Sequence, residues 1–139
     1  MGGNSRITMA IESRLADVGL VGVAVRAIAL AAGFADHDAG LLQLALEEAL
    51  TNVIRHAYQE RPGNQVTVEI TVSPDQLTFL VSHQGAGLQF WPTKTSHSPD
   101  PMQEGGRGIF LINSIMDSVN HANRAGQSRL TMTKRRGTP

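Results

Sequence analysis

The sequence predicts an α+β fold: a two-layer sandwich in which a mixed or antiparallel β-sheet is covered on one face by helices. Segments with the apolar alternation of strands and segments with helical spacing both occur, and they do not alternate one for one along the chain. With 139 residues and 41% hydrophobic content, the chain is long enough for one compact core and short for two ordinary domains. We therefore expect a single domain over residues 1–139.

The first part of the chain is expected to form one strand and two helices. Apolar residues alternate over 7–11, as they do in a half-buried strand. A stretch rich in Ala, Leu and Val, from residue 13 or 14 to residue 32, favours a helix that ends at the glycine that follows. Asp36 or Asp38 is then expected to cap a second helix, because the apolar spacing over 41–59 is the strongest helical pattern in the sequence.

The second part is expected to form two hairpins separated by a loop and a helix. Strict alternation over 66–72 and again over 77–81, with a Pro-containing turn between them, predicts the first hairpin. A long segment without periodicity follows, and then an apolar helical segment over 109–116. Two further apolar runs, 119–122 and 128–134, predict a closing hairpin.

Composition excludes several classes of function. Twelve basic residues balance twelve acidic ones, so no overall field favours nucleic acid or an anionic membrane, and the basic tail 134–136 is interpreted as a solvated end. The absence of cysteine excludes a disulfide framework, thiolate catalysis and a cysteine zinc site. The longest apolar stretch, 20–34, contains Arg26 and is too short to span a bilayer, and the N-terminus lacks the pattern of a signal peptide. We expect a cytoplasmic protein.

One polar stripe on the second predicted helix carries possible chemistry. At 3.6 residues per turn, Glu48, Asn52 and Arg55 lie on one face, with His56 beside them. A carboxylate and an amide one turn apart can hold a hydroxyl proton and a hard cation such as Mg²⁺. The alternative is an ordinary solvated helix face. Glu47 is equally acidic and is expected to point elsewhere.

Two glycine-rich segments offer further candidates. In "EGGRGIFL", over 104–111, glycines precede a helix whose free N–H groups can bind a phosphate, and Arg107 can add a charge-assisted contact. In "FLVSHQGAG", over 79–87, Gly85 and Gly87 follow a strand and permit a flat ligand to approach closely. Taken alone, both segments also fit ordinary loops.

Together and in order, the three segments resemble the nucleotide-binding boxes of the Bergerat-type, histidine-kinase-like ATPase fold. The helix 48–58 with "EALTN" and "HAY", the strand end Gly85-x-Gly87, and "GGRGIFLINSIMD" over 105–117 carry the resemblance. The variant that they resemble is the bacterial anti-sigma factor serine kinase family, for which "EAxTNxxxHAY" and "GGxGLFLI…LMD" are typical. The resemblance spans nearly the whole chain, and two intact boxes at the right separation are more specific than either alone.

The resemblance implies a set of roles at these positions. Glu48 would be the general base that activates the attacking hydroxyl, and Asn52 would ligate the Mg²⁺ that accompanies ATP. Residues 88–104 would form the ATP lid. The residues expected to contact the nucleotide or its metal are Asn52, His56, His83, Gly85, Gly87, Gly105, Gly106, Arg107 and Gly108.

The resemblance also implies the partners. A member of this family phosphorylates a serine or threonine of a small STAS-domain anti-sigma antagonist, and it sequesters a sigma factor, usually as a homodimer. This partner switching controls transcription in the stress response without direct contact to nucleic acid or membrane.

His83 departs from the family pattern, which is Asp-x-Gly-x-Gly at the strand end, with the aspartate accepting a hydrogen bond from the adenine amino group. A neutral imidazole can accept one hydrogen bond, but a protonated imidazole cannot. The loss of a charged acceptor would cost about 1.5–3 kcal/mol and would weaken adenine recognition.

Three interpretations therefore compete. The first is an active kinase with altered adenine contacts, which Glu48 and Asn52 favour. The second is a partner-binding module of the same fold that uses little or no nucleotide and grips a sigma factor or a STAS antagonist, which His83 favours. The third is a plain α+β domain with accidental motifs.

Overall fold

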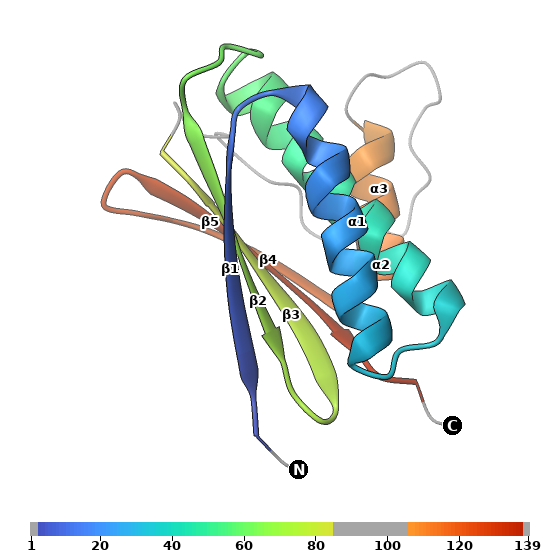
Figure 1. The fold of residues 1–139 in the computed structure, drawn as a ribbon. Helices are drawn as coiled ribbons and strands as arrows, with labels where there is room; N and C mark the ends of the chain where they lie inside the picture. Colours follow the sequence, from blue (N-terminus) through green and yellow to red (C-terminus); the bar gives the residue numbers. More distant parts are fainter. Residues whose placement is uncertain (1–2, 85–105, 138–139) are drawn as a thin grey trace.

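The computed structural model describes residues 3–84 and 106–137, and it shows a five-stranded antiparallel sheet with helices on one face (Figure 1). The strand order is β1-β2-β3-β5-β4. This confirms the predicted α+β sandwich. In chain order the elements are β1 (Ser5–Glu12), α1 (Leu15–Ala31), α2 (Asp36–Asn52), η1 (Val53–Ala57), β2 (Gln65–Val72), β3 (Gln76–His83), α3 (Gly106–Ile115), β4 (Ser118–Arg124) and β5 (Gln127–Arg135).

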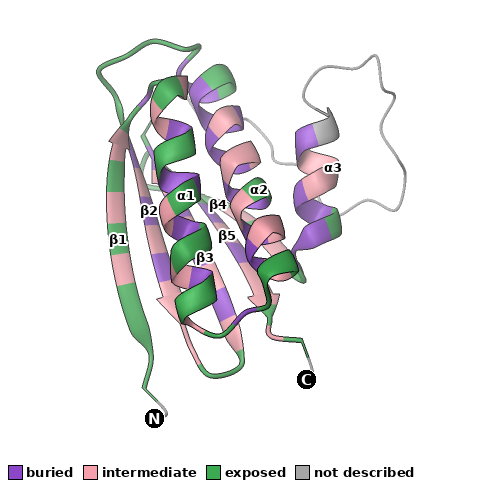
Figure 2. Cartoon of the chain, turned by 45° about the vertical axis from the view of Figure 1, so that its right-hand side comes forward, coloured by how far each residue is buried: buried purple, intermediate pink, exposed green. Residues whose placement is uncertain are grey.

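Alternation along the central strands determines which face of the sheet packs against the helices. In β3 every second side chain is buried, from Leu77 through Phe79 and Val81 to His83. Figure 2 shows the matching stripe of buried residues along the side of α1 and α2 that faces the sheet. Each large apolar side chain buried in this layer contributes about 1.5–3 kcal/mol to stability. The core therefore lies between the sheet and a single layer of helices.

At the connection between α1 and α2, one prediction from the sequence is confirmed and another is wrong. Gly33 has φ +97°, so it provides the left-handed residue that ends α1, as predicted. The capping prediction is wrong: Ala35 precedes α2, with no side-chain cap, and Asp36 and Asp38 lie in its first turn. Asp36 forms an ion pair of 2.6 Å with Arg26 of α1, so its carboxylate joins two helices rather than capping one.

Helix α2 ends in a π-helical turn, which is wider than a turn of α-helix. The predicted segment 41–59 is observed as α2 followed by the π-helical turn η1. Gln59 and Glu60 then have φ values of 53° and 59°, in the left-handed region that non-glycine residues rarely adopt. π-turns and strained residues of this kind are often found beside functional sites.

The basic tail is not a solvated end, which corrects the prediction for residues 134–136. Lys134 and Arg135 belong to β5, and the Arg136 guanidinium donates hydrogen bonds to the carbonyls of Ala32 and, at 3.0 Å, Pro74. It also lies 4.6 Å from the centre of the Phe34 ring. Arg136 thus joins the end of α1 to the β2–β3 turn.

The start of β1 and the end of β5 lie at the same end of the sheet. Ser5, where β1 begins, pairs with Val72, and Arg135, where β5 ends, pairs with Gln76. Val72 and Gln76 flank the β2–β3 turn. His83 lies at the opposite end of β3.

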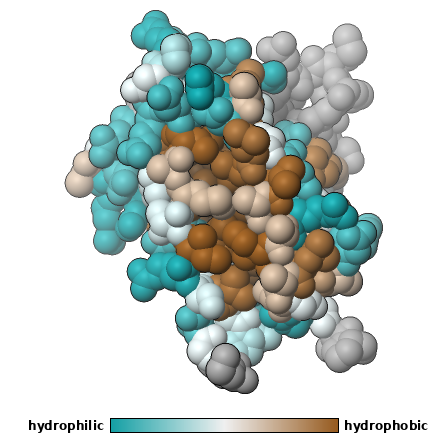
Figure 3. Space-filling model, viewed as in Figure 1, coloured by the Kyte–Doolittle hydropathy of each residue, from teal (hydrophilic) through white to brown (hydrophobic). Residues whose placement is uncertain are grey.

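An apolar face of α1 is exposed to solvent. Figure 3 shows apolar side chains gathered over this helix. Leu20, Val23 and Leu30 are 71%, 65% and 42% exposed, whereas a helix that is apolar on all sides is normally buried. Among the described residues, no helix is long and apolar enough to cross a membrane.

Candidate functional site

Two of the predicted boxes meet where α3 begins against α2. A Cβ atom added to Gly108 would lie 2.7 Å from Glu48 Oε2 and 3.4 Å from Asn52 Nδ2. The first distance is shorter than a van der Waals contact and the second is at its lower limit, so a side chain at position 108 would force the Glu48 carboxylate to move, whereas glycine leaves it in place against α3. The helix box and the glycine box therefore form one site.

The two polar side chains of this site are available for a ligand. Asn52 is 7% exposed, and no described residue bonds its Nδ2 atom. Among the described residues, no hydrogen bond or ion pair engages the half-buried Glu48 carboxylate. The carboxylate oxygens of Glu48 and the Oδ1 oxygen of Asn52 are of the type that Mg²⁺ prefers, usually together with phosphate oxygens. The described part of the chain contains no cluster of three or more His, Cys, Asp or Glu side chains that could hold a metal ion by itself.

The neighbouring acid points away from this site, as the sequence predicts. The Glu47 carboxylate packs over Gly22 of α1, where an added Cβ would overlap its Oε2 atom at 1.9 Å. Gln43 donates a hydrogen bond of 2.9 Å to the same oxygen. Arg55 and His56, by contrast, are exposed on η1.

The end of β3 is fixed by a tyrosine from the end of the helix. The Tyr58 hydroxyl donates to the Gln65 carbonyl (3.1 Å) and accepts from the Gln84 N–H (2.9 Å), so it joins the start of β2 to the residue after β3. Its ring meets the His83 ring edge to face, at 5.8 Å and 72°. The sequence pattern indicates no role for Tyr58, although it is the last residue of the "HAY" motif.

His83 is a buried, neutral imidazole. It is 4% exposed, and its Nδ1 atom is buried without a hydrogen-bond partner among the described residues. Burial, and to a smaller extent the charge of His121, lowers the pKa of His83 to about 4. Burial also lowers the pKa of His121, whose Nε2 shares a hydrogen bond of 2.6 Å with the Ser128 hydroxyl. At neutral pH, His83 can therefore accept or donate one hydrogen bond at each ring nitrogen, depending on its tautomer.

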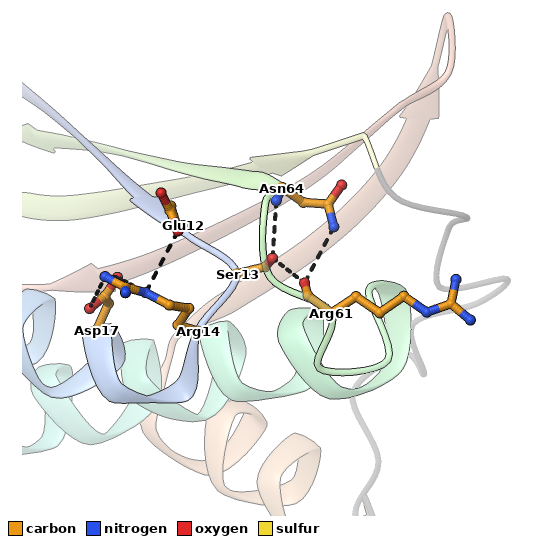
Figure 4. A network of polar contacts seen from close by, with 6 residues as sticks. All are labelled: Glu12, Ser13, Arg14, Asp17, Arg61 and Asn64. Carbon is orange, nitrogen blue, oxygen red and sulfur yellow. Dashed lines mark hydrogen bonds and ion pairs between the residues drawn. The ribbon is translucent and has the colours of Figure 1, made fainter.

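A cavity of about 760 Å³ opens beside His83, large enough for a nucleoside. Its lining includes Tyr58, Gln84 and residues of the loop 61–64, but neither Glu47 nor Glu48 of α2. Figure 4 shows how this loop is attached: the buried Ser13 hydroxyl donates to the Arg61 carbonyl and accepts from the Asn64 N–H. The Arg61 guanidinium extends away from this network.

The structure describes only some of the remaining predicted site residues. Gly106 and Arg107 lie in the first turn of α3, which begins three residues before the predicted segment 109–116, so they are part of the helix rather than residues that precede it. Gly85, Gly87 and Gly105, and the expected lid 88–104, lie outside the described residues. Their contacts with a nucleotide stay predictions.

Comparison with known proteins identifies the family. The sequence profile described as "Histidine kinase-like ATPase domain" matches residues 11–134. The chain belongs to the histidine kinase-like ATPase family. This ATPase domain is 30% identical over 135 residues to "Serine-protein kinase RsbW" of Bacillus subtilis (strain 168), and 32% identical to the protein of that name from Bacillus velezensis. Each match covers 92% of the chain and 84% of the relative.

A solved structure supports the same fold. The crystal structure of the RsbU and RsbW domains of Rv1364c from Mycobacterium tuberculosis superposes on this ATPase domain with a TM-score of 0.69, at 14% identity. The match covers 97% of the chain and 33% of that longer protein. This match supports the fold, while the profile and the relatives confirm the family resemblance seen in the sequence.

Proposed function

We propose that this protein is an anti-sigma factor serine/threonine protein kinase, which transfers a phosphoryl group from ATP to a STAS-domain antagonist. The observation that supports it is the contact of Gly108 with Glu48 and Asn52, which unites the two boxes expected of a nucleotide site. Relatives named serine-protein kinase over most of the chain favour the same reaction.

The residues present fit Mg²⁺ and the phosphates of ATP. Asn52 carries an Oδ1 oxygen of the kind that ligates Mg²⁺ and an Nδ2 donor, without a partner among the described residues, that could bond a phosphate oxygen; Gly108 leaves the space beside it free of a side chain. Gly106 and Arg107 begin α3, whose N-terminal N–H groups favour an anion. When bound, Mg·ATP supplies the electrophilic phosphoryl group.

Glu48 is the proposed general base. Its carboxylate would accept the proton of the attacking serine or threonine hydroxyl as the new O–P bond forms, and ADP would carry away the electrons of the broken bond. Asn52 would orient the metal ion, and Gly108 would keep the carboxylate within reach of it. Phosphoryl transfer needs few protein groups, because positioning and electrostatics supply most of the catalysis.

The protein partners proposed are a STAS-domain antagonist that presents the hydroxyl, a sigma factor that is sequestered in the cytoplasm, and a second copy of the chain in a homodimer. The exposed apolar residues Leu20, Val23 and Leu30 of α1 support protein–protein contact, since clustered apolar surface of this kind marks interaction sites.

One observation favours a second candidate, a partner-binding module that uses little or no nucleotide. His83 stands where the family places an adenine-binding carboxylate, and its Nδ1 atom is buried without a partner among the described residues. A module of this kind would bind its partner equally well with and without nucleotide.

The test begins with calorimetric titration of the purified protein with Mg·ATP and Mg·ADP. Phosphotransfer to a STAS partner is then followed with labelled ATP, in the wild type, Glu48→Ala and Glu47→Ala. We expect Glu48→Ala to slow transfer by about 10²- to 10⁴-fold with similar nucleotide affinity, because it removes a general base. Glu47→Ala is the matched control, since that carboxylate faces α1. Absent nucleotide binding, or equal transfer by the wild type and Glu48→Ala, would refute the kinase proposal.

A further inference from the structure

The cavity beside His83 has an unusual chemical lining for a site that must choose adenine. Among the described residues that line it there is no aspartate or glutamate. Apart from Arg61, the polar side chains are amides, hydroxyls and imidazoles, namely His56, Tyr58, Gln59, Asn64, Gln65, Thr67, Ser82, His83, Gln84 and Gln127. Each of these groups can both donate and accept a hydrogen bond.

A purine is distinguished at its 6-position by the direction of one hydrogen bond. Adenine carries an amino group there, which donates, whereas guanine and hypoxanthine carry an oxygen, which accepts. A carboxylate only accepts, so it binds the amino group and repels the oxygen. A neutral imidazole offers a lone pair at one nitrogen and an N–H at the other, so it can meet either group.

The geometry keeps His83 ready for such a contact. Its ring lines the cavity, and the edge-to-face contact with Tyr58 orients it. Tyr58 is itself held by its bonds to Gln65 and Gln84. Nδ1 is buried without a hydrogen-bond partner among the described residues, so none of them fixes the tautomer of the ring.

We propose that this site accepts 6-oxopurine nucleotides as well as adenine nucleotides, and that His83 is the residue that sets this base choice. The proposal rests on the proposed nucleotide-binding function and names its substrate class: purine nucleoside triphosphates rather than ATP alone.

The test compares Mg·ATP with Mg·ITP, whose base has oxygen at position 6 and no 2-amino group, by calorimetry on the full chain. We expect the wild type to bind the two within about tenfold of each other. His83→Asp should widen the ratio at least tenfold in favour of Mg·ATP, because a mismatched hydrogen bond to a charged group costs one to two orders of magnitude in affinity. His83→Asn is the matched control: it has the shape of Asp but donates as well as accepts, so its ratio should stay near that of the wild type.

Three outcomes would overturn the proposal. The first is a preference of more than a hundredfold for Mg·ATP in the wild type, which decides the matter even where His83→Asp does not fold. The second is the same nucleotide ratio for the Asp and Asn variants. In both cases Mg·ATP still binds, so the kinase proposal survives. The third is no binding of either nucleotide by the wild type and both variants, and this outcome also refutes nucleotide use.

Discussion

Acid should destabilise this protein through His83 in a narrow and predictable range of pH. The pKa of the imidazole is about 4 in the folded chain, against 6.5 as its ordinary value. The unfolded chain therefore takes up a proton first as the pH falls. The stability that depends on neutral His83 is complete above pH 6.5 and is lost progressively as the pH falls toward 4.

The size of the effect follows from the two pKa values. A tenfold difference in proton affinity corresponds to about 1.4 kcal/mol, so full protonation of His83 lowers the free energy of unfolding by about 3 kcal/mol. At pH 5 the decrease should already be about 2 kcal/mol. That is a large share of the free energy of unfolding of a small domain, which is about 5–15 kcal/mol. The desolvation argument applies because His83 is 4% exposed.

The assay is urea unfolding at pH 7, 6 and 5, for the wild type and His83→Asn. Carboxylates that titrate in this range affect both proteins, so the difference between them isolates His83. The wild type should lose about 2 kcal/mol more than the variant between pH 7 and pH 5. His37→Asn is the control, because it removes an exposed imidazole. Parallel pH profiles for the wild type and His83→Asn would refute the reasoning.

Further predictions concern packing and association. Gly108→Ala should slow phosphotransfer at least tenfold, because its Cβ would lie 2.7 Å from a carboxylate oxygen; Gly40→Ala, with open space around it, should leave the rate unchanged in the same assay. Arg136→Ala should lower the free energy of unfolding in urea by about 2 kcal/mol, since it removes charged hydrogen bonds to carbonyls. Arg135→Ala, on an exposed side chain, should change it by less than about 0.5 kcal/mol. Leu20→Lys should weaken association with a second copy or another partner at least tenfold, measured by light scattering and calorimetry, with unfolding nearly unchanged; equal association would exclude this face of α1 as the contact.

Much of the fold could be predicted because its signals are local. Strict alternation over 66–72 and 77–81 led to β2 and β3 within one or two residues at each end. Gly33 ends α1 because its left-handed conformation is one that glycine adopts without strain. The two motifs predict that Glu48 and Gly108 belong to one site, and the packing of α3 on α2 brings these two residues together.

What could not be predicted depends on contacts between distant residues. Arg136 bonds the carbonyl of Ala32, 104 positions earlier in the chain, and no local pattern distinguishes this arginine from a solvated one. Asp36 has the sequence signature of a cap, but an arginine from α1 engages its carboxylate instead. The role of Tyr58 depends on the wider turn of η1, which side-chain periodicity does not reveal.

The start of β1 and the end of β5 both lie at the end of the sheet where the β2–β3 turn is, and this determines where the protein can be labelled. Ser5 and Arg135 lie at one end of the sheet, whereas His83 lies at the other. A fluorophore, an affinity tag or a fused carrier attached to either end would therefore be held away from the cavity. The protein can be tethered to a sensor surface by its N- or C-terminal side, with nucleotide still free to reach the opposite end.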